Sequence, residues 1–151
     1  MYYNYLHSPL GLIEIAANEQ GLTAVSFCTA ATQPCSEQPL LLAAKTQLAA
    51  YFGKELTEFD LPLAATGTDF QLQVWQALRS VPYGQTASYR DIAIAIANPK
   101  GVRAVGLANS KNPLAIIVPC HRVIGLTGYA GGLDKKAWLL QHEDVTGLKW
   151  C

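Results

Sequence analysis

The chain has 151 residues, of which 50% are hydrophobic, and its formal net charge is zero. This size and composition fit one compact domain or two small ones and exclude a disordered chain. No apolar run approaches the ~20 residues that span a bilayer, and residues 1–4 do not resemble the start of a signal peptide. We therefore expect a cytoplasmic protein without a membrane partner.

The first part of the chain is predicted to form a small antiparallel sheet covered by one helix. Short strands separated by turn residues are expected over Tyr2–Ser8, Gly11–Asn18 and Gly21–Cys28. A helix is predicted near Pro39 to Phe52 because four of its apolar residues share one face: Leu41, Ala44, Leu48 and Tyr51. A fourth strand is expected around Phe59–Leu63, and the small residues 64–68 mark the expected boundary to the second part.

The second part is predicted to be mostly helical. A helix capped by Thr68 or Asp69 is expected to run to about Ser80, with a core-facing stripe of Phe70, Val74, Trp75 and Leu78. The capping-box pattern at Ser88–Asp91 predicts a second helix over Tyr89–Ala97. Pro99 suits the first turn of a third helix, roughly Lys100–Asn109, and a short turn between the last two helices predicts a helix-turn-helix.

The third predicted helix has small side chains, which would let it approach another backbone closely. A helix that reads the major groove normally carries several long polar side chains, whereas this one offers mainly Arg103 and Asn109. If it binds DNA, we therefore expect binding without sequence readout.

Charge is divided unevenly between the two parts. Residues 1–78 carry two basic and seven acidic residues, a net charge of −5, and residues 79–151 carry nine and four, a net charge of +5. Between Ile92 and Leu133 there are four basic residues and no acidic one: Lys100, Arg103, Lys111 and Arg122. A basic face on a neutral protein indicates a DNA-binding half, although four cations in such a stretch are also compatible with ordinary solvation.

A reactive thiol is indicated by the sequence Pro119-Cys120-His121-Arg122, which directly follows the apolar run Leu114–Val118. A cysteine flanked by an imidazole and a guanidinium can be held as the thiolate, the nucleophilic form. The alternative is that Cys120 is a buried apolar residue, His121 a surface histidine and Arg122 a solvated charge. The four cysteines include no C-x-x-C pair, and the three histidines add no metal-ligand spacing. Cys28, Cys35 and His7 could in principle hold a metal, but their spacing does not favour it, so we predict no metal site.

An ordered series of motifs accompanies this tetrapeptide. The series includes Phe70–Trp75, Val81–Gly84, Ser88-Tyr89, Asn98-Pro99, Val102–Gly106, Asn112-Pro113, Ile117–Ile124, Tyr129–Gly132, Trp138–Leu140 and His142-Glu143. Together they cover about half of the chain, and in this order they resemble the O6-alkylguanine-DNA alkyltransferase family.

The resemblance implies an α+β fold in two domains. Residues 1–66 would form a ribonuclease H-like sheet and helix, and residues 67–151 a winged-helix-like domain with the helix-turn-helix. It also implies a monomer that needs no cofactor and binds double-stranded DNA containing O6-alkylguanine through the minor groove. The alkyl group would pass irreversibly to Cys120 from a flipped-out nucleotide, so that each molecule acts once.

The resemblance also implies roles for individual residues. Cys120 would accept the alkyl group, His121 would draw away its proton through a water, and Glu143 would orient His121. Asn112 would brace the active-site segment, Tyr89 would donate to N3 of the departing guanine, and Arg103 would fill the space left by the flipped nucleotide. The remaining DNA-binding residues would be Ala104, Gly106, Asn109, Ser110, Lys111 and Arg122, the last with either a structural or a phosphate-facing role. The base pocket would be lined by Tyr89, Val123, Tyr129, Ala130 and Gly131.

Physical chemistry accounts for these residue types. Displacement at a saturated carbon needs a polarizable nucleophile, and a thiolate serves where a hydroxyl would be slow. Guanine leaves more readily if a proton donor such as the Tyr89 hydroxyl meets its developing charge. Two alternatives are a lesion-binding relative without the acceptor cysteine, against which Cys120 argues, and a cysteine hydrolase, which would leave the helix-turn-helix unexplained.

Overall fold

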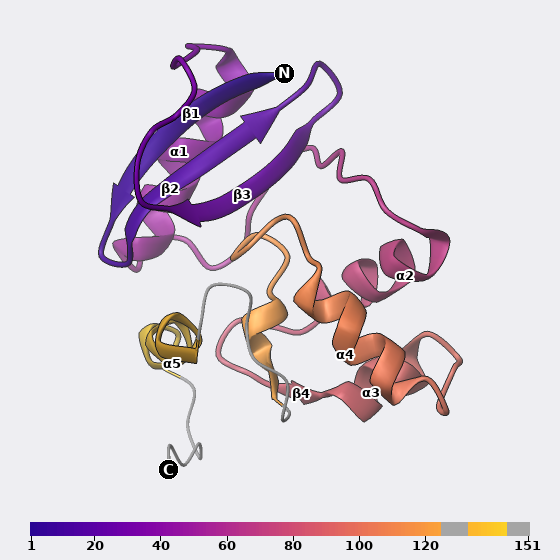
Figure 1. The fold of residues 1–151 in the computed structure, drawn as a ribbon. Coiled ribbons are helices and arrows are strands. Elements are labelled where there is room, and N and C mark those ends of the chain that lie inside the picture. The colour runs from indigo at the N-terminus through magenta and orange to yellow at the C-terminus, as the bar shows by residue number, and fades with distance from the viewer. Residues whose placement is uncertain (125–132, 145–151) are drawn as a thin grey trace. The chain divides into compact units, whose positions relative to one another are not determined.

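The computed structural model describes residues 1–124 and 133–144 (Figure 1). Its chain divides into two compact units. The first comprises Met1–Thr66 together with Pro113–Ala115, and the second comprises Gly67–Asn112 and Ile116–Cys151.

The sheet of the first unit has three antiparallel strands in the order β1-β2-β3. They are β1 (Tyr2–Ser8), β2 (Gly11–Ala17) and β3 (Leu22–Cys28), each within one residue of the predicted bounds. The β1–β2 register runs from the pair Tyr2 and Ala17 to the pair Ser8 and Gly11. Gly11 takes φ 102 at the tight turn, a conformation that glycine adopts without a side-chain clash.

Helix α1 (Pro39–Phe52) packs against β1 and β2 and closes the core of this unit. Its predicted apolar face is confirmed, since the four residues named for it are all buried. The sheet contributes the fully buried side chains of Ile13, Ile15 and Leu22. Burial of this apolar face, rather than helix propensity alone, holds the helix in place.

The expected fourth strand over residues 59–63 is wrong. That stretch contributes only an isolated bridge between Leu63 and Leu22, where the Leu22 N–H donates to the Pro62 carbonyl at 2.9 Å and the Ala64 N–H donates to the Leu22 carbonyl at 2.7 Å. Pro62 has no N–H to extend a ladder, which explains why the pairing stops there.

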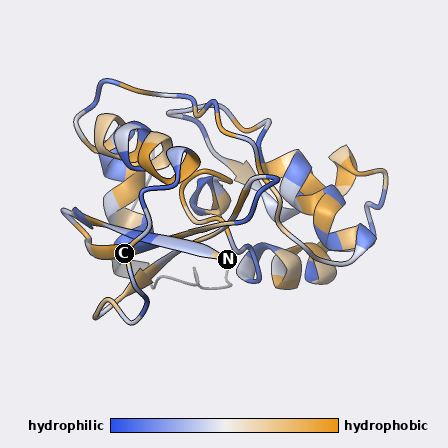
Figure 2. Cartoon of the chain, turned by 90° about the horizontal axis from the view of Figure 1, so that it is seen from above, coloured by the Kyte–Doolittle hydropathy of each residue, from blue (hydrophilic) through white to orange (hydrophobic). Residues whose placement is uncertain are grey.

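Three helices form the body of the second unit: α2 (Asp69–Leu78), α3 (Tyr89–Ala95) and α4 (Val102–Ser110). The predicted caps are confirmed, because Thr68 and Ser88 each form a reciprocal capping box. Figure 2 shows hydrophobic and hydrophilic residues alternating along the helices, as expected for helices that bury one side. Of the predicted α2 stripe, three residues are buried, and Phe70 is half-buried.

The connection between α3 and α4 differs from the prediction. It spans residues 96–101, so Pro99 lies in the turn and not in the first turn of α4. Helix α3 ends early because Ala97 takes φ 58, and the Gly101 N–H then donates to the Asn98 carbonyl at 2.9 Å. The helix-turn-helix is present with a longer turn than the sequence suggested.

The remaining elements of this unit are short. Strands β4 (Ala87–Ser88) and β5 (Val123–Ile124) pair in parallel, and β5 follows the 3-10 turn Cys120–Arg122. Helix α5 (Leu133–His142) contacts that 3-10 turn. Among the described residues, no helix is long and apolar enough to cross a membrane.

Candidate active site

Cys120 lies buried in the 3-10 turn at the end of the apolar segment. The turn is held from both sides, since its Cys120 N–H donates to the Val118 carbonyl at 2.8 Å and the Arg122 N–H donates to the Pro119 carbonyl at 3.0 Å. The Asn112 side chain donates from Nδ2 to the same Val118 carbonyl at 2.9 Å. The backbone that carries the thiol is therefore fixed by several hydrogen bonds.

The middle of this apolar segment is also in an unusual conformation. Ile116, which is buried, takes φ 72. A β-branched residue in the left-handed region costs on the order of 1–3 kcal/mol, so the surrounding packing must hold it there. Backbone strain thus lies four residues before the candidate nucleophile.

His121, Glu143 and Arg122 form one buried network beside the thiol. The His121 Nε2 lies 2.7 Å from Glu143 Oε2. Arg122 donates to both carboxylate oxygens, from Nε to Oε1 at 2.7 Å and from Nη2 to Oε2 at 3.1 Å. The alternative of a surface histidine and a solvated arginine is therefore wrong.

Arg122 is held on its other sides as well. Its Nη1 donates to the Val81 carbonyl at 2.8 Å, and the guanidinium lies over the Tyr83 ring at 5.6 Å from the centroid. Because its Nε, Nη1 and Nη2 atoms all donate hydrogen bonds, the planar guanidinium is held in place and fixes the orientation of the Glu143 carboxylate.

The charges of the network follow from burial and hydrogen bonding. Burial lowers the pKa of His121, against the opposing hydrogen bond and charge of Glu143. Burial would raise the pKa of Glu143, but the hydrogen bonds from His121 and Arg122 outweigh it and lower the pKa to about 2. A neutral imidazole that donates from Nε2 to an ionised Glu143 keeps Nδ1 as its basic nitrogen.

Lys136 is a residue that the sequence reasoning missed. It is buried on α5 and donates from Nζ to the Val123 carbonyl at 2.6 Å. Burial lowers the pKa of Lys136, and the negative charge that Cys120 can carry opposes this effect. The spacing of Lys136, Leu140 and Glu143, four and then three residues apart, could have placed all three on one helical face.

In the structure, some of the residues predicted to contact DNA are exposed and others are buried. Arg103, Ala104 and Lys111 are exposed and Ser110 is half-buried, so these remain available to a ligand. Gly106 is buried.

The predicted DNA contacts of Asn109 and Arg122 are wrong, because the side chains of both residues are buried inside the unit. Asn109 is 2% exposed, and its Nδ2 lies 3.5 Å from the Cys120 carbonyl. Arg122 is 6% exposed and forms the ion pair with Glu143, so the structural role applies and not the phosphate-facing one.

The predicted base pocket is described only in part. Tyr89 is the first residue of α3 and is buried, as is Val123 in β5. The parallel pairing of β4 with β5 brings the segment before Tyr89 alongside the segment after Cys120. Tyr129, Ala130 and Gly131 lie outside the described residues.

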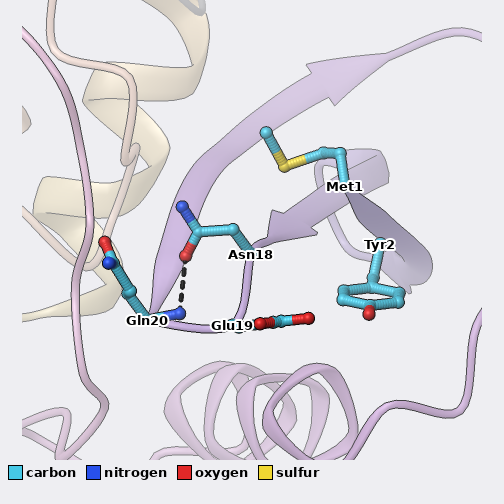
Figure 3. A pocket seen from close by; sticks show the side chains of 5 residues that line it. All are labelled: Met1, Tyr2, Asn18, Glu19 and Gln20. Atoms are coloured by element: carbon cyan, nitrogen blue, oxygen red, sulfur yellow. Dashed lines mark hydrogen bonds between the residues drawn. The ribbon is translucent and has the colours of Figure 1, made fainter.

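An open pocket of about 360 Å³ lies in the first unit, far along the chain from these residues. Figure 3 shows its lining, formed by Met1, Tyr2, Asn18, Glu19 and Gln20. The Gln20 N–H donates to Asn18 Oδ1 at 2.8 Å, which is ordinary turn chemistry between two strands. None of the predicted site residues lines this pocket.

The fold and the site together define a class of protein. It pairs a small sheet-and-helix unit with a helix-turn-helix unit that buries a cysteine beside a histidine and a carboxylate. Two family models match the chain: the ribonuclease-like domain of 6-O-methylguanine DNA methyltransferase over residues 1–65, and the DNA binding domain of the same family over residues 69–145. The chain belongs to the 6-O-methylguanine DNA methyltransferase family.

Individual relatives agree with this assignment. The chain is 51% identical over 153 residues to a methylated-DNA–protein-cysteine methyltransferase of Methanosarcina acetivorans, covering 95% of this chain and 98% of the relative. It is 49% identical over 150 residues to the Mycolicibacterium paratuberculosis protein of the same name, covering 93% and 91%. The crystal structure of Mycobacterium tuberculosis OGT in complex with DNA matches with a TM-score of 0.87 at 47% identity, covering 95% of this chain and 93% of that one.

Proposed function

We propose that this protein repairs DNA by transferring the alkyl group of O6-alkylguanine irreversibly to its own Cys120. The type of reaction, transfer of an alkyl group, is supported by membership of the methyltransferase family. The observation that carries the assignment to Cys120 is its place in the chain directly before His121, which is hydrogen-bonded to the buried Glu143 at 2.7 Å. A base next to a thiol, oriented by a third group, is the arrangement that activates a nucleophile.

The transfer is a displacement at the alkyl carbon. His121 takes the thiol proton at Nδ1, through a water as the family resemblance implies, and the Cys120 sulfur forms a bond to the carbon. The bond between that carbon and O6 breaks, and the electron pair leaves with guanine, which takes a proton at N3 from Tyr89. The product is a thioether that water does not reverse, so each molecule acts once.

Three further residues support this chemistry. The positive charge of Lys136 attracts a negative charge on Cys120 and so favours the thiolate. Lys136 also donates a hydrogen bond to the Val123 carbonyl of the proposed base pocket. Asn112 and the 3-10 turn keep the sulfur in place. The buried Arg122 keeps Glu143 ionised.

DNA is the proposed partner, bound through α3 and α4. The exposed cations Lys100, Arg103 and Lys111 would face the phosphates and the minor groove, with Arg103 filling the space of the flipped nucleotide. The division into domains at residues 66 and 67, the monomeric state and the cytoplasmic location remain predictions.

The test is an adduct measurement on the whole protein. After incubation with duplex DNA that contains one O6-methylguanine, we expect one added methyl group per molecule, mapped by peptide mass spectrometry to Cys120. Cys35→Ser, which changes an exposed cysteine, should react like the wild type, and Cys120→Ser should not react. A methyl group on another cysteine, or none at all, would refute the assignment.

A further inference from the structure

Ile116 combines three features that no other described residue shares: it is β-branched, it is buried, and its backbone is left-handed. Its φ is 72 and its side chain is 1% exposed. The other described residues with positive φ, glycines excepted, are Lys54, Ala97 and Asp144, and all three are exposed and unbranched at Cβ. A β-branched side chain fits this conformation poorly, so the neighbouring structure must hold Ile116 in it.

The residues before Ile116 are fastened to strand β3 of the first unit. The Val25 N–H donates to the Pro113 carbonyl at 2.9 Å, and the Ala115 N–H donates to the Val25 carbonyl at 3.1 Å. These two bonds form the parallel bridge between Val25 and Leu114, and Leu114 is buried. Because this three-residue segment belongs to the first unit and the chain re-enters the second unit at Ile116, the left-handed residue stands where the chain passes from one to the other.

The residues after Ile116 are held by hydrogen bonds and by burial. The Val118 carbonyl accepts from Asn112 Nδ2 at 2.9 Å and from the Cys120 N–H at 2.8 Å. Ile117 and Val118 are both buried. Since both flanks are held, the backbone angles of Ile116 set the direction in which the chain continues towards Cys120.

We propose that Ile116 is a positioning residue for the transfer: its buried side chain locks the left-handed turn, and the turn aligns the Cys120 sulfur with the alkyl carbon. The inference rests on the proposed function. Displacement requires the reacting atoms to be aligned at about 3–3.5 Å, and a small shift of the nucleophile slows it strongly. A glycine would adopt the same φ without a clash, but it would adopt others as readily and leave the sulfur less well placed. An isoleucine held by packing does not have that freedom.

The test measures transfer and thiol reactivity separately in Ile116→Gly. We expect methyl transfer to be at least about tenfold slower than in wild type, on duplex DNA and on the free base O6-methylguanine alike, because the sulfur is misaligned for both. Alkylation of Cys120 by iodoacetamide, followed by peptide mass spectrometry, needs no such alignment and should be no slower than in wild type. The pH profile of that reaction and the Kd for undamaged duplex should be unchanged.

Two further variants separate positioning from a general loss of packing. Ile116→Val keeps a β-branched side chain at the turn and should transfer within about twofold of wild type. Leu48→Ala removes a fully buried side chain of the first unit and should transfer like wild type. Rates are compared at a temperature where circular dichroism shows every variant to be folded. If Ile116→Gly does not fold, Ile116→Ala takes its place with the same expected rates, because it also lacks the anchoring side chain.

The inference is overturned if Ile116→Gly transfers the methyl group as fast as wild type, or if Ile116→Val is as slow as Ile116→Gly. It is also overturned if the iodoacetamide reaction slows as much as the transfer, since Ile116 would then affect formation of the thiolate. An equal loss of rate in Leu48→Ala would assign the effect to stability instead. In each of these cases transfer by the wild type upholds the proposed function, whereas a wild type that transfers no methyl group refutes both.

Discussion

Replacing Arg122 by methionine removes the guanidinium from Glu143 but retains a long side chain that can fill the same buried space. The carboxylate would keep its bond to His121 and lose both bonds to Arg122, and the Val81 carbonyl would lose its donor. A buried carboxylate left with one partner is strongly destabilising, so we expect this change to cost more than an ordinary surface substitution.

The magnitude follows from the pKa of Glu143, which its partners hold at about 2 instead of 4.5. That difference corresponds to about 3 kcal/mol in favour of the ionised form. Removing one partner of a buried ion pair costs about 3–5 kcal/mol, so we expect Arg122→Met to lower the free energy of unfolding by about 3 kcal/mol at pH 7.

The pH dependence has a definite sign. Because the folded pKa of Glu143 lies below its unfolded value, its stabilisation is complete above pH 4.5 and is lost as the pH falls towards 2. Arg122→Met removes part of that lowering. The stability gap between wild type and variant should therefore be widest above pH 4.5 and shrink below it.

Urea unfolding followed by tryptophan fluorescence, at several pH values from 7 to 3, measures this gap. Arg103→Met removes an exposed arginine of the same unit and should cost less than about 0.5 kcal/mol. Arg122→Met combined with Glu143→Gln should be more stable than the sum of the single effects predicts, by at least about 1 kcal/mol. Additive effects, or a gap that does not change with pH, would refute the reasoning.

Two further predictions concern the transfer step. Because burial lowers the pKa of His121, the rate with free O6-methylguanine should stay level as the pH falls through 6.5; a rate already halved at pH 6.5 in a stopped-flow or quench assay would contradict a neutral, buried base. Lys136→Met should slow transfer by about tenfold on both duplex and free base, since it removes the cation that favours the Cys120 thiolate. The control variant Lys135→Met should react like wild type. A loss of rate confined to duplex DNA would point to DNA binding instead.

Local patterns in the sequence predicted most of the secondary structure. The three strands, the buried face of α1 and the capping boxes at Thr68 and Ser88 depend on residues close together in the chain. The early end of α3 was missed because the left-handed conformation of Ala97 has no signal in its residue type. The expected fourth strand is reduced to a single bridge between Leu63 and Leu22, because Pro62 has no N–H with which to extend the ladder.

The two-part α+β organisation and the Cys120-His121 motif could be read from the sequence, because they follow from local periodicity and from residues adjacent in the chain. The pairing of His121 with Glu143 was implied only by the resemblance to the alkyltransferase family, and the structure places the two side chains 2.7 Å apart. Which polar residues are buried could be learned only from the packing of the folded chain. Arg122 reaches Glu143 across 21 positions and Val81 across 41, and Lys136 meets Val123 across 13. Whether a charge faces water or a buried partner depends on the packing of such distant segments, which the composition of either segment does not reveal.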